Sequence, residues 1–284
     1  MMRYEEIGGQ AAMAKSPLIW FGGKSKLAPL IVARMPPHKV YVEPFGGAAH
    51  VIAAKPTADI EVYNDIDGDL VNFLLVARDE PERLVQTAES LPYSRLLYET
   101  WKREPLPDEP FERAVRWFYL NRSGIAKGNA DRTTGWRHSR SPGTNPAQGY
   151  HSAVQLIRDF ADRMRNVQIE CRDFREVIRT YDSADTLFYV DPPYIGREQY
   201  YAGEFTEADH RDLAELLNSI QGKAIVSYYD HPMLNELYQS WRREVVTGYA
   251  QAVNGGGPRV TKEVLLYNFN PISSVQMSLW EVDV

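Results

Sequence analysis

The stretch TLFYVDPPY, residues 186–194, joins an apolar segment directly to a rigid polar loop. Residues 186–190 have the length and the near-continuous apolar character of a buried β-strand. The loop Asp191-Pro192-Pro193-Tyr194 then presents a carboxylate, a backbone carbonyl fixed by proline and an aromatic ring. In open α/β sheets, ligands bind at the carboxyl ends of strands. We therefore expect an α/β fold with a functional loop that begins at Asp191.

The chemistry of this loop suits an exocyclic amine on a nucleobase. Such an amine is a poor nucleophile, because its lone pair is conjugated with the ring. Two acceptors, the Asp191 carboxylate and the Pro192 carbonyl, would hold its two N–H groups and favour the tetrahedral, nucleophilic form. Tyr194 is expected to stack on the base. The same four residues also fit a proline-rich surface turn in which Asp191 caps a helix.

Strand and helix patterns alternate on both sides of a central region. Upstream, we expect strands over 39–45 and 60–63 and helices over 48–54 and 67–77. Downstream, we expect a helix over 206–220, a strand over 224–228, an antiparallel pair formed by 244–249 and 263–269, and a last strand over 274–282. This order predicts one largely parallel sheet.

The central region has no strand pattern from residue 81 to about 167. Helices are expected over 109–120 and 152–164, separated by a polar stretch over 121–150. We therefore predict a flexible leader over 1–15, a discontinuous catalytic domain over 16–80 and 167–284, and a mostly helical target-recognition insertion over 81–166.

Composition excludes several classes of protein. The single cysteine, Cys171, excludes a disulfide framework and a cysteine-based zinc cluster, and no metal site is expected. No apolar run is long enough to span a membrane, and residues 1–15 lack the apolar core of a signal peptide, so a cytoplasmic location is expected. The net charge of −6 does not decide nucleic-acid binding, because affinity depends on where the cations lie.

Two short motifs near the amino end fit a nucleoside ligand. Glu43-Pro44-Phe45-Gly46-Gly47 follows a strand, and Asp65 comes 22 residues after Glu43, at the end of the next strand. The pattern is not that of a dinucleotide site, and alone it also fits a tight turn before a capped helix. Trp20-Phe21-Gly22-Gly23-Lys24 suits a zwitterion, since a lysine meets a carboxylate and a tryptophan attracts a sulfonium. A β-turn with a core tryptophan is the alternative.

Taken in order, these pieces resemble the Dam-type, alpha-class DNA adenine N6-methyltransferases. The shared pieces are Trp20–Lys24, Val42–Ala48, Asn64–Asp67, Asn121–Gly124 and Asp191–Tyr194. The resemblance covers about residues 16 to 270. It implies a Rossmann-like sheet that binds S-adenosylmethionine, and a target adenine flipped out of double-stranded DNA.

The resemblance also implies roles for individual residues. Trp20 and Lys24 would contact the amino-acid end of the cofactor, and Asp65 its ribose. The full implied cofactor set is Trp20, Lys24, Glu43, Phe45, Gly46, Asp65, Asp173, Phe174 and Asp191. The implied catalytic set is Asp191, Pro192 and Tyr194.

Residues 121–140 form the most basic segment of the predicted insertion. Five cations and one acid, Asp131, give it a net charge of +4. The residues expected to contact DNA are Asn121, Arg122, Lys127, Arg132, Arg137 and Arg140. A solvated linker is the alternative. The segment does not show the arginine and tyrosine arrangement of GATC-specific enzymes, so the target sequence stays open.

The sequence therefore predicts methyl transfer from S-adenosylmethionine to adenine in DNA, with a cognate restriction endonuclease or a phage origin as further expectations. An enzyme that methylates the exocyclic amine of cytosine is one alternative, although such enzymes more often carry serine in place of Asp191. A non-catalytic DNA-binding relative and an RNA or protein methyltransferase are the others.

Overall fold

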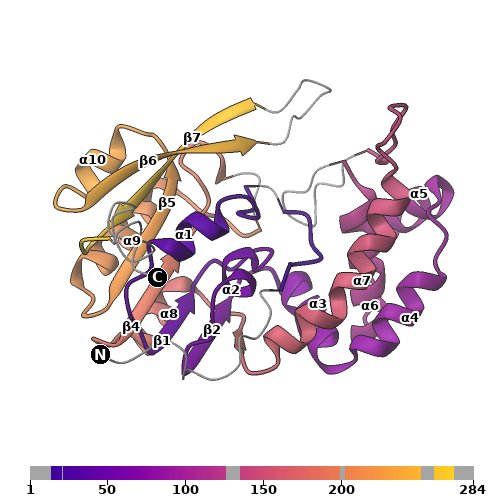
Figure 1. Ribbon diagram of the computed structural model, residues 1–284, viewed down its shortest axis with the longest axis horizontal. Coiled ribbons are helices and arrows are strands. Elements are labelled where there is room, and N and C mark those ends of the chain that lie inside the picture. Colours follow the sequence, from indigo (N-terminus) through magenta and orange to yellow (C-terminus); the bar gives the residue numbers. More distant parts are fainter. Residues whose placement is uncertain (1–13, 21, 126–134, 199–201, 251–258, 272–284) are drawn as a thin grey trace, which may run out of the picture.

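A single sheet organises the computed structural model, which describes residues 14–20, 22–125, 135–198, 202–250 and 259–271 (Figure 1). Its strand order is β3-β2-β1-β4-β5-β7-β6. The strands are β1 (Val40–Glu43), β2 (Ile60–Asn64), β3 (Gln168–Glu170), β4 (Thr186–Val190), β5 (Lys223–Tyr229), β6 (Arg242–Ala250) and β7 (Arg259–Tyr267). The first five in this order are parallel, and β7 is antiparallel to both neighbours. The predicted α/β fold, Rossmann-like and mostly parallel, is confirmed.

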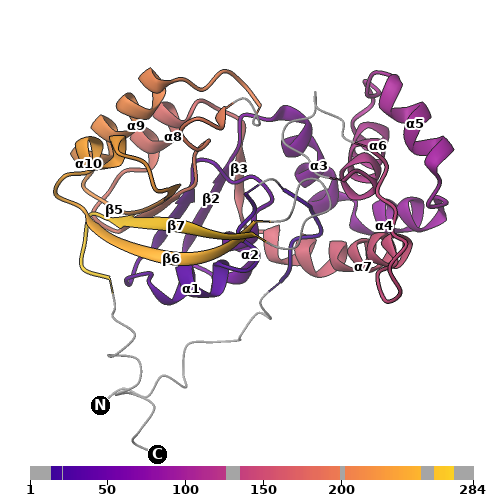
Figure 2. The ribbon, with the colours of Figure 1, turned by 90° about the horizontal axis from the view of Figure 1, so that it is seen from above.

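The centre of the sheet is apolar on both faces. Every residue of β4 is buried, and Val42 of β1 lies in register with Val62 of β2 and Phe188 of β4. Helices α1 (Ala28–Ala33) and α2 (His50–Ala54) cover one face, and α8 (Phe174–Tyr181), α9 (Glu207–Ser219) and α10 (Met233–Leu237) cover the other (Figure 2). Burial on both faces is why β4 reads as an unbroken apolar run rather than an alternating one.

A group of helices stands beside the β3 end of the sheet (Figure 2). It contains α3 (Gly68–Asp79), α4 (Pro81–Ser90), α5 (Arg95–Arg103), α6 (Pro110–Ser123) and α7 (Pro146–Met164). Helix α3, which precedes residue 81, packs against α6 and α7. Its core stacks Phe73 of α3 on Trp117 and Phe118 of α6, with ring centroids 5.4 and 5.3 Å apart.

A buried ion cluster ties this helical group to the sheet. Glu61 of β2 accepts hydrogen bonds from both terminal nitrogens of Arg163 in α7, at 2.6 and 2.8 Å. Lys55 bonds the same carboxylate at 2.6 Å. All three side chains are at most 8% exposed. Removing one partner from such a cluster is costly, because it leaves a buried charge unpaired.

Most expected elements appear, with shifted ends. Thr206 caps α9 with the reciprocal Asp209 bond of a capping box. The polar stretch expected over 121–150 is shorter, because α6 runs to Ser123 and Pro146 starts α7. Helices α1, α4, α5, α8 and α10 and strand β3 were not expected. Residues 1–13 of the expected leader and the expected strand over 274–282 lie outside the described residues. No helix in the described part has the length and apolarity to cross a membrane.

Candidate active site

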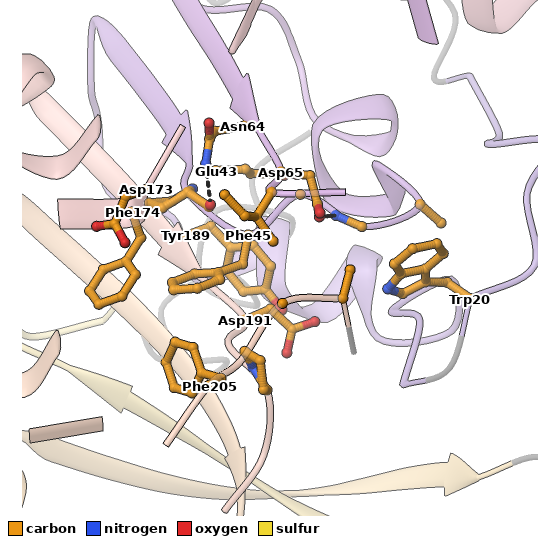
Figure 3. Close-up of a pocket in the computed structure, with 18 of the residues that line it drawn as sticks. Trp20, Glu43, Phe45, Asn64, Asp65, Asp173, Phe174, Tyr189, Asp191 and Phe205 are labelled. Atoms are coloured by element: carbon orange, nitrogen blue, oxygen red, sulfur yellow. Dashed lines mark hydrogen bonds between the residues drawn. The ribbon is translucent and has the colours of Figure 1, made fainter. Parts of the chain in front are cut away.

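A pocket lies at the carboxyl ends of β1, β2 and β4 (Figure 3). All nine residues expected to bind the cofactor line it: Trp20, Lys24, Glu43, Phe45, Gly46, Asp65, Asp173, Phe174 and Asp191. Figure 3 shows Phe174 and Phe205 at one end, Trp20 at the other and Asp191 between them. The sheet topology therefore brings together residues that are up to 171 positions apart in the chain.

The glycine loop after β1 approaches β2 too closely for side chains. A Cβ atom on Gly46 would lie 2.0 Å from the ring of Tyr63, and Gly47 has a positive φ of 48°. The Tyr63 hydroxyl donates to the Gly47 carbonyl at 2.6 Å. Trp20 packs over the same loop, since its indole nitrogen lies 2.7 Å from where a Gly47 Cβ would stand. The two glycines thus let the loop after β1 turn tightly and form a rim of the pocket without side chains.

Asn64 and Asp65 fix this rim from the end of β2. The Asn64 amide donates to the Pro44 carbonyl at 2.8 Å and to the Arg172 carbonyl at 3.0 Å. The Asp65 carboxylate accepts the Gly47 N–H at 2.8 Å. Burial raises the pKa of Asp65 to about 6, against the opposing effect of these backbone donors. Each Asp65 oxygen retains a lone pair that a ligand hydroxyl can use.

Three phenylalanines form the apolar end of the pocket. Phe45 lies 5.2 Å from Phe174 and 5.8 Å from Phe205, centroid to centroid. Asp173 caps α8 and pairs with Arg175, which also binds Asp209 of α9. This end offers aromatic faces beside carboxylates, an arrangement that suits a flat heterocycle with N–H donors.

Glu43 is buried in the floor of the pocket. Its side chain is 2% exposed and accepts the Tyr41 hydroxyl at 2.6 Å. Burial raises the pKa of Glu43 to about 8, because the hydrogen bond from Tyr41 and the charges of Lys55 and Arg163 offset only part of the desolvation.

Both carboxylate oxygens of Asp191 are held in place. The Ser227 hydroxyl of β5 donates to Oδ1 at 2.7 Å, and the Lys24 ammonium meets Oδ2 at 2.9 Å. Tyr189 of β4 supports Ser227 through a hydroxyl contact of 3.2 Å. The Asp191 side chain is still 20% exposed and faces the pocket, so its remaining lone pairs can accept N–H donors.

Tyr194 differs from the expectation that it stacks on a base. It is 2% exposed in this structure and meets Tyr229 edge-on, with centroids 4.5 Å apart. Its hydroxyl accepts a bond of 2.7 Å from Lys24. Pro192, like Tyr194, does not line the pocket, whereas Pro193 does. The roles of Pro192 and Tyr194 stay predictions.

The residues expected to contact DNA divide into three groups where the structure describes them. The Asn121 side chain is 1% exposed and bonds both the N–H and the carbonyl of Ile19, so its polar atoms face protein. Arg140 is exposed. Lys127 and Arg132 lie outside the described residues.

Arg122 and Arg137 form the third group, and both bind backbone carbonyls. Arg122 donates to Gly149 at 3.0 Å, and Arg137 donates to Gly124 at 2.9 Å and to Ile125 at 2.8 Å. Burial, with the nearby Arg137 charge, lowers the pKa of Arg122 to about 10. These two arginines shape the segment that begins after α6.

Several pocket residues carried no recognisable signal in the sequence. Tyr189 reads as one more apolar strand residue, Phe205 as a residue before a helix cap, and His50 as the start of a helix, yet all three line the pocket. Burial lowers the pKa of His50 to about 4, with Lys24 adding to the shift. For Ser227, which holds Asp191, the only sequence signal was its position directly before Tyr228-Tyr229, near the end of a buried strand.

The geometry provides both a binding pocket for a ligand and a hydrogen-bond acceptor beside that ligand. One elongated pocket can hold a ligand with a flat ring, hydroxyls and a charged tail, and Asp191 presents an acceptor partway along it. A fixed acceptor next to a bound donor molecule is what transfer to an amine requires.

Comparison with known proteins agrees with this arrangement. The model of a family described as D12 class N6 adenine-specific DNA methyltransferase matches residues 20–251. The DNA adenine methylase of Escherichia coli K12 is 26% identical over 275 residues, covering 89% of this chain and 95% of the relative. The DNA adenine methylases of Vibrio cholerae and Haemophilus influenzae are each 26% identical, and cover 91% and 78% of this chain and 97% and 82% of their own lengths.

Proposed function

Because the chain belongs to the D12 class N6 adenine-specific DNA methyltransferase family, we propose that its strand-end pocket binds S-adenosylmethionine and that Asp191 receives the adenine amine. The enzyme methylates adenine in DNA. The observation that supports the site assignment is the convergence of the nine expected residues, Asp191 among them, on one pocket.

The residues of the pocket fit this cofactor along its length. Phe45 and Phe174 provide faces for the adenine ring, with Asp173 nearby as an acceptor. Asp65 retains lone pairs for the ribose hydroxyls. At the far end, Trp20 offers an aromatic face, and Lys24, beside Asp191, contributes a positive charge. When bound, this cofactor supplies an electrophilic methyl group.

The protein then activates the amine by holding it. Asp191 accepts one N–H of the adenine amine, and the Pro192 carbonyl is proposed to accept the other. This grip draws the nitrogen out of conjugation and directs its lone pair at the methyl carbon. The bound cofactor would supply the methyl group and would keep the electrons of its broken carbon–sulfur bond. Asp191 would stabilise the cationic amine, which would then release one proton to solvent.

DNA is proposed to lie across the basic segment between α6 and α7. Arg140 is exposed there, whereas Arg122 and Arg137 bind backbone carbonyls. Lys127 and Arg132 are proposed to add phosphate contacts. We also propose a restriction endonuclease that cuts the same target sequence as a partner.

Labelled products test the proposal. The protein is incubated with S-adenosylmethionine carrying a tritiated methyl group and with unmethylated genomic DNA, and the DNA is digested to nucleosides. We expect label in N6-methyl-2′-deoxyadenosine alone. Label only in cytosine, or protein that fails to bind the cofactor in calorimetry, contradicts it.

A further inference from the structure

Glu263 of β7 lies behind the active site without lining the pocket. Its side chain is 6% exposed, and its carboxylate is 3.6 Å from the Lys24 ammonium. Burying a carboxylate is unfavourable unless a specific partner compensates for its lost hydration. Lys24, itself 3% exposed, is that partner, and it is also the residue that holds Asp191.

Four side chains form one connected unit, which we call the Lys24 cluster: Lys24, Asp191, Tyr194 and Glu263. The Lys24 ammonium reaches Asp191 Oδ2 at 2.9 Å and the Tyr194 hydroxyl at 2.7 Å. The Tyr194 hydroxyl donates in turn to Glu263 Oε2 at 3.3 Å. Lys24 also donates to the Gly22 carbonyl at 2.8 Å. The ammonium therefore has a defined position, fixed from several directions.

The antiparallel end of the sheet places Glu263 in this cluster. Glu263 lies opposite Tyr229 of β5 and Val246 of β6, and Tyr229 is the residue that packs on Tyr194. The following residues Val264 and Leu265 are fully buried. A residue held between two paired strands has little freedom, so its carboxylate is a fixed charge rather than a mobile one.

The charge of Lys24 explains why Glu263, the second carboxylate beside it, affects the acceptor strength of Asp191. A buried ammonium beside Asp191 draws electron density from the carboxylate that is to accept the adenine amine. Glu263 shares that ammonium, so the cluster contains one cation and two carboxylates. Interactions among buried charges are strong, because water screens them poorly. The net negative charge left in the cluster favours a reacting amine that becomes cationic.

We propose that Glu263 is a positioning residue for methyl transfer, which acts by holding Lys24 and by offsetting its charge so that Asp191 remains a strong acceptor. This inference rests on the proposed function. Burial raises the pKa of Glu263 and Lys24 opposes that rise, as expected for a carboxylate that faces this ammonium.

Steady-state kinetics of E263Q test the proposal. We expect kcat to fall about tenfold or more, since transition-state charge stabilisation is lost, while KM for DNA and for S-adenosylmethionine changes less than about twofold. The matched control is E244Q, which removes a carboxylate of the neighbouring strand β6 that binds Arg34 and does not line the pocket. E244Q is expected to keep kcat within about twofold.

A double-mutant cycle shows whether Glu263 acts through Lys24. In the K24M background, E263Q is expected to cause no further fall in kcat, because its target is gone. E263D, which keeps the charge and shortens the side chain, is expected to lose less kcat than E263Q at an unchanged melting temperature. E263D also provides the kinetic test if E263Q does not fold.

Three outcomes overturn the inference: unchanged kcat in both Glu263 variants, a rise in cofactor KM without a change in kcat, and full additivity of K24M and E263Q. Failure of the proposed function is distinguishable from these, because then the wild-type protein itself transfers no methyl group to adenine.

Discussion

The pocket and the basic segment after α6 use their charged side chains in opposite ways. Around the pocket, Lys24 and Asp191 are gathered by β4 and by segments distant in the chain, and they face each other within 2.9 Å. In residues 121–140, Arg122 and Arg137 bind carbonyls close by in the chain or on the next helix. Charged side chains therefore pair with each other at the candidate site in one region and hold backbone carbonyls in the other.

This contrast teaches that the net charge of a segment does not tell which of its charged side chains are available to bind a ligand. A count of cations identifies a basic segment but not where each side chain points. Arg137 is counted with Arg140, although its guanidinium is occupied by Gly124 and Ile125 while Arg140 is exposed. The predictions below separate the two uses of charge.

The largest effect is expected at the pocket. D191A is predicted to lower kcat by about a thousandfold, because the proposed acceptor for the amine is lost, while cofactor affinity measured by calorimetry falls far less. Circular dichroism checks that the variant is folded. Normal turnover by D191A would show that Asp191 is not the acceptor.

A smaller effect concerns the buried carboxylate of Glu43. Its pKa in the folded protein is about 8, above the ordinary value of 4.5. A raised carboxyl pKa means that folding favours the protonated form, so stability is present below pH 4.5 and is lost as the pH rises toward 8. E43Q has no such group. Its stability relative to wild type is therefore expected to rise by about 2 kcal/mol between pH 6 and pH 8.

Urea unfolding at the two pH values, without cofactor, measures this difference. A constant gap between E43Q and wild type would show that Glu43 keeps an ordinary pKa.

The smallest effects distinguish the two kinds of arginine. R137A is predicted to lower the free energy of unfolding by about 1–2 kcal/mol, since two carbonyls lose a charged donor. R140A is predicted to change it by less than about 0.5 kcal/mol, yet to weaken DNA binding at low salt in a salt-dependent way. Fluorescence anisotropy with a DNA duplex, at two salt concentrations, provides the binding measurement. Equal stability losses in both variants would remove the distinction.

Much of the fold was predictable because its signals are local. The apolar run of β4, the Thr206 cap of α9 and the glycines after β1 each depend on neighbouring residues. Helices α4 and α5 were not predicted, because short helices in a polar stretch draw their stability from packing rather than from their own sequence. Residue Tyr98 is the only buried residue of α5.

The residues of the candidate site likewise divide into those that the sequence identified and those that it did not. The motif residues Trp20, Phe45, Asp65 and Asp191 were identifiable from order and spacing, and all line the pocket. Phe205, Ser227 and Glu263 were not, because nothing in their local sequence marks them and their contacts with the site are made by residues distant in the chain.

The sequence by itself determined the α/β class, the order of the motifs and the family to which they belong, because these depend on residue type and spacing along the chain. Only the tertiary structure decided which charged side chains lie close enough to interact. Lys24, Asp191 and Glu263 are separated by 167 and 72 positions, and they meet because parallel β4 and antiparallel β7 both flank β5. Electrostatic coupling depends on distance in space and on burial, and neither is written in the order of residues.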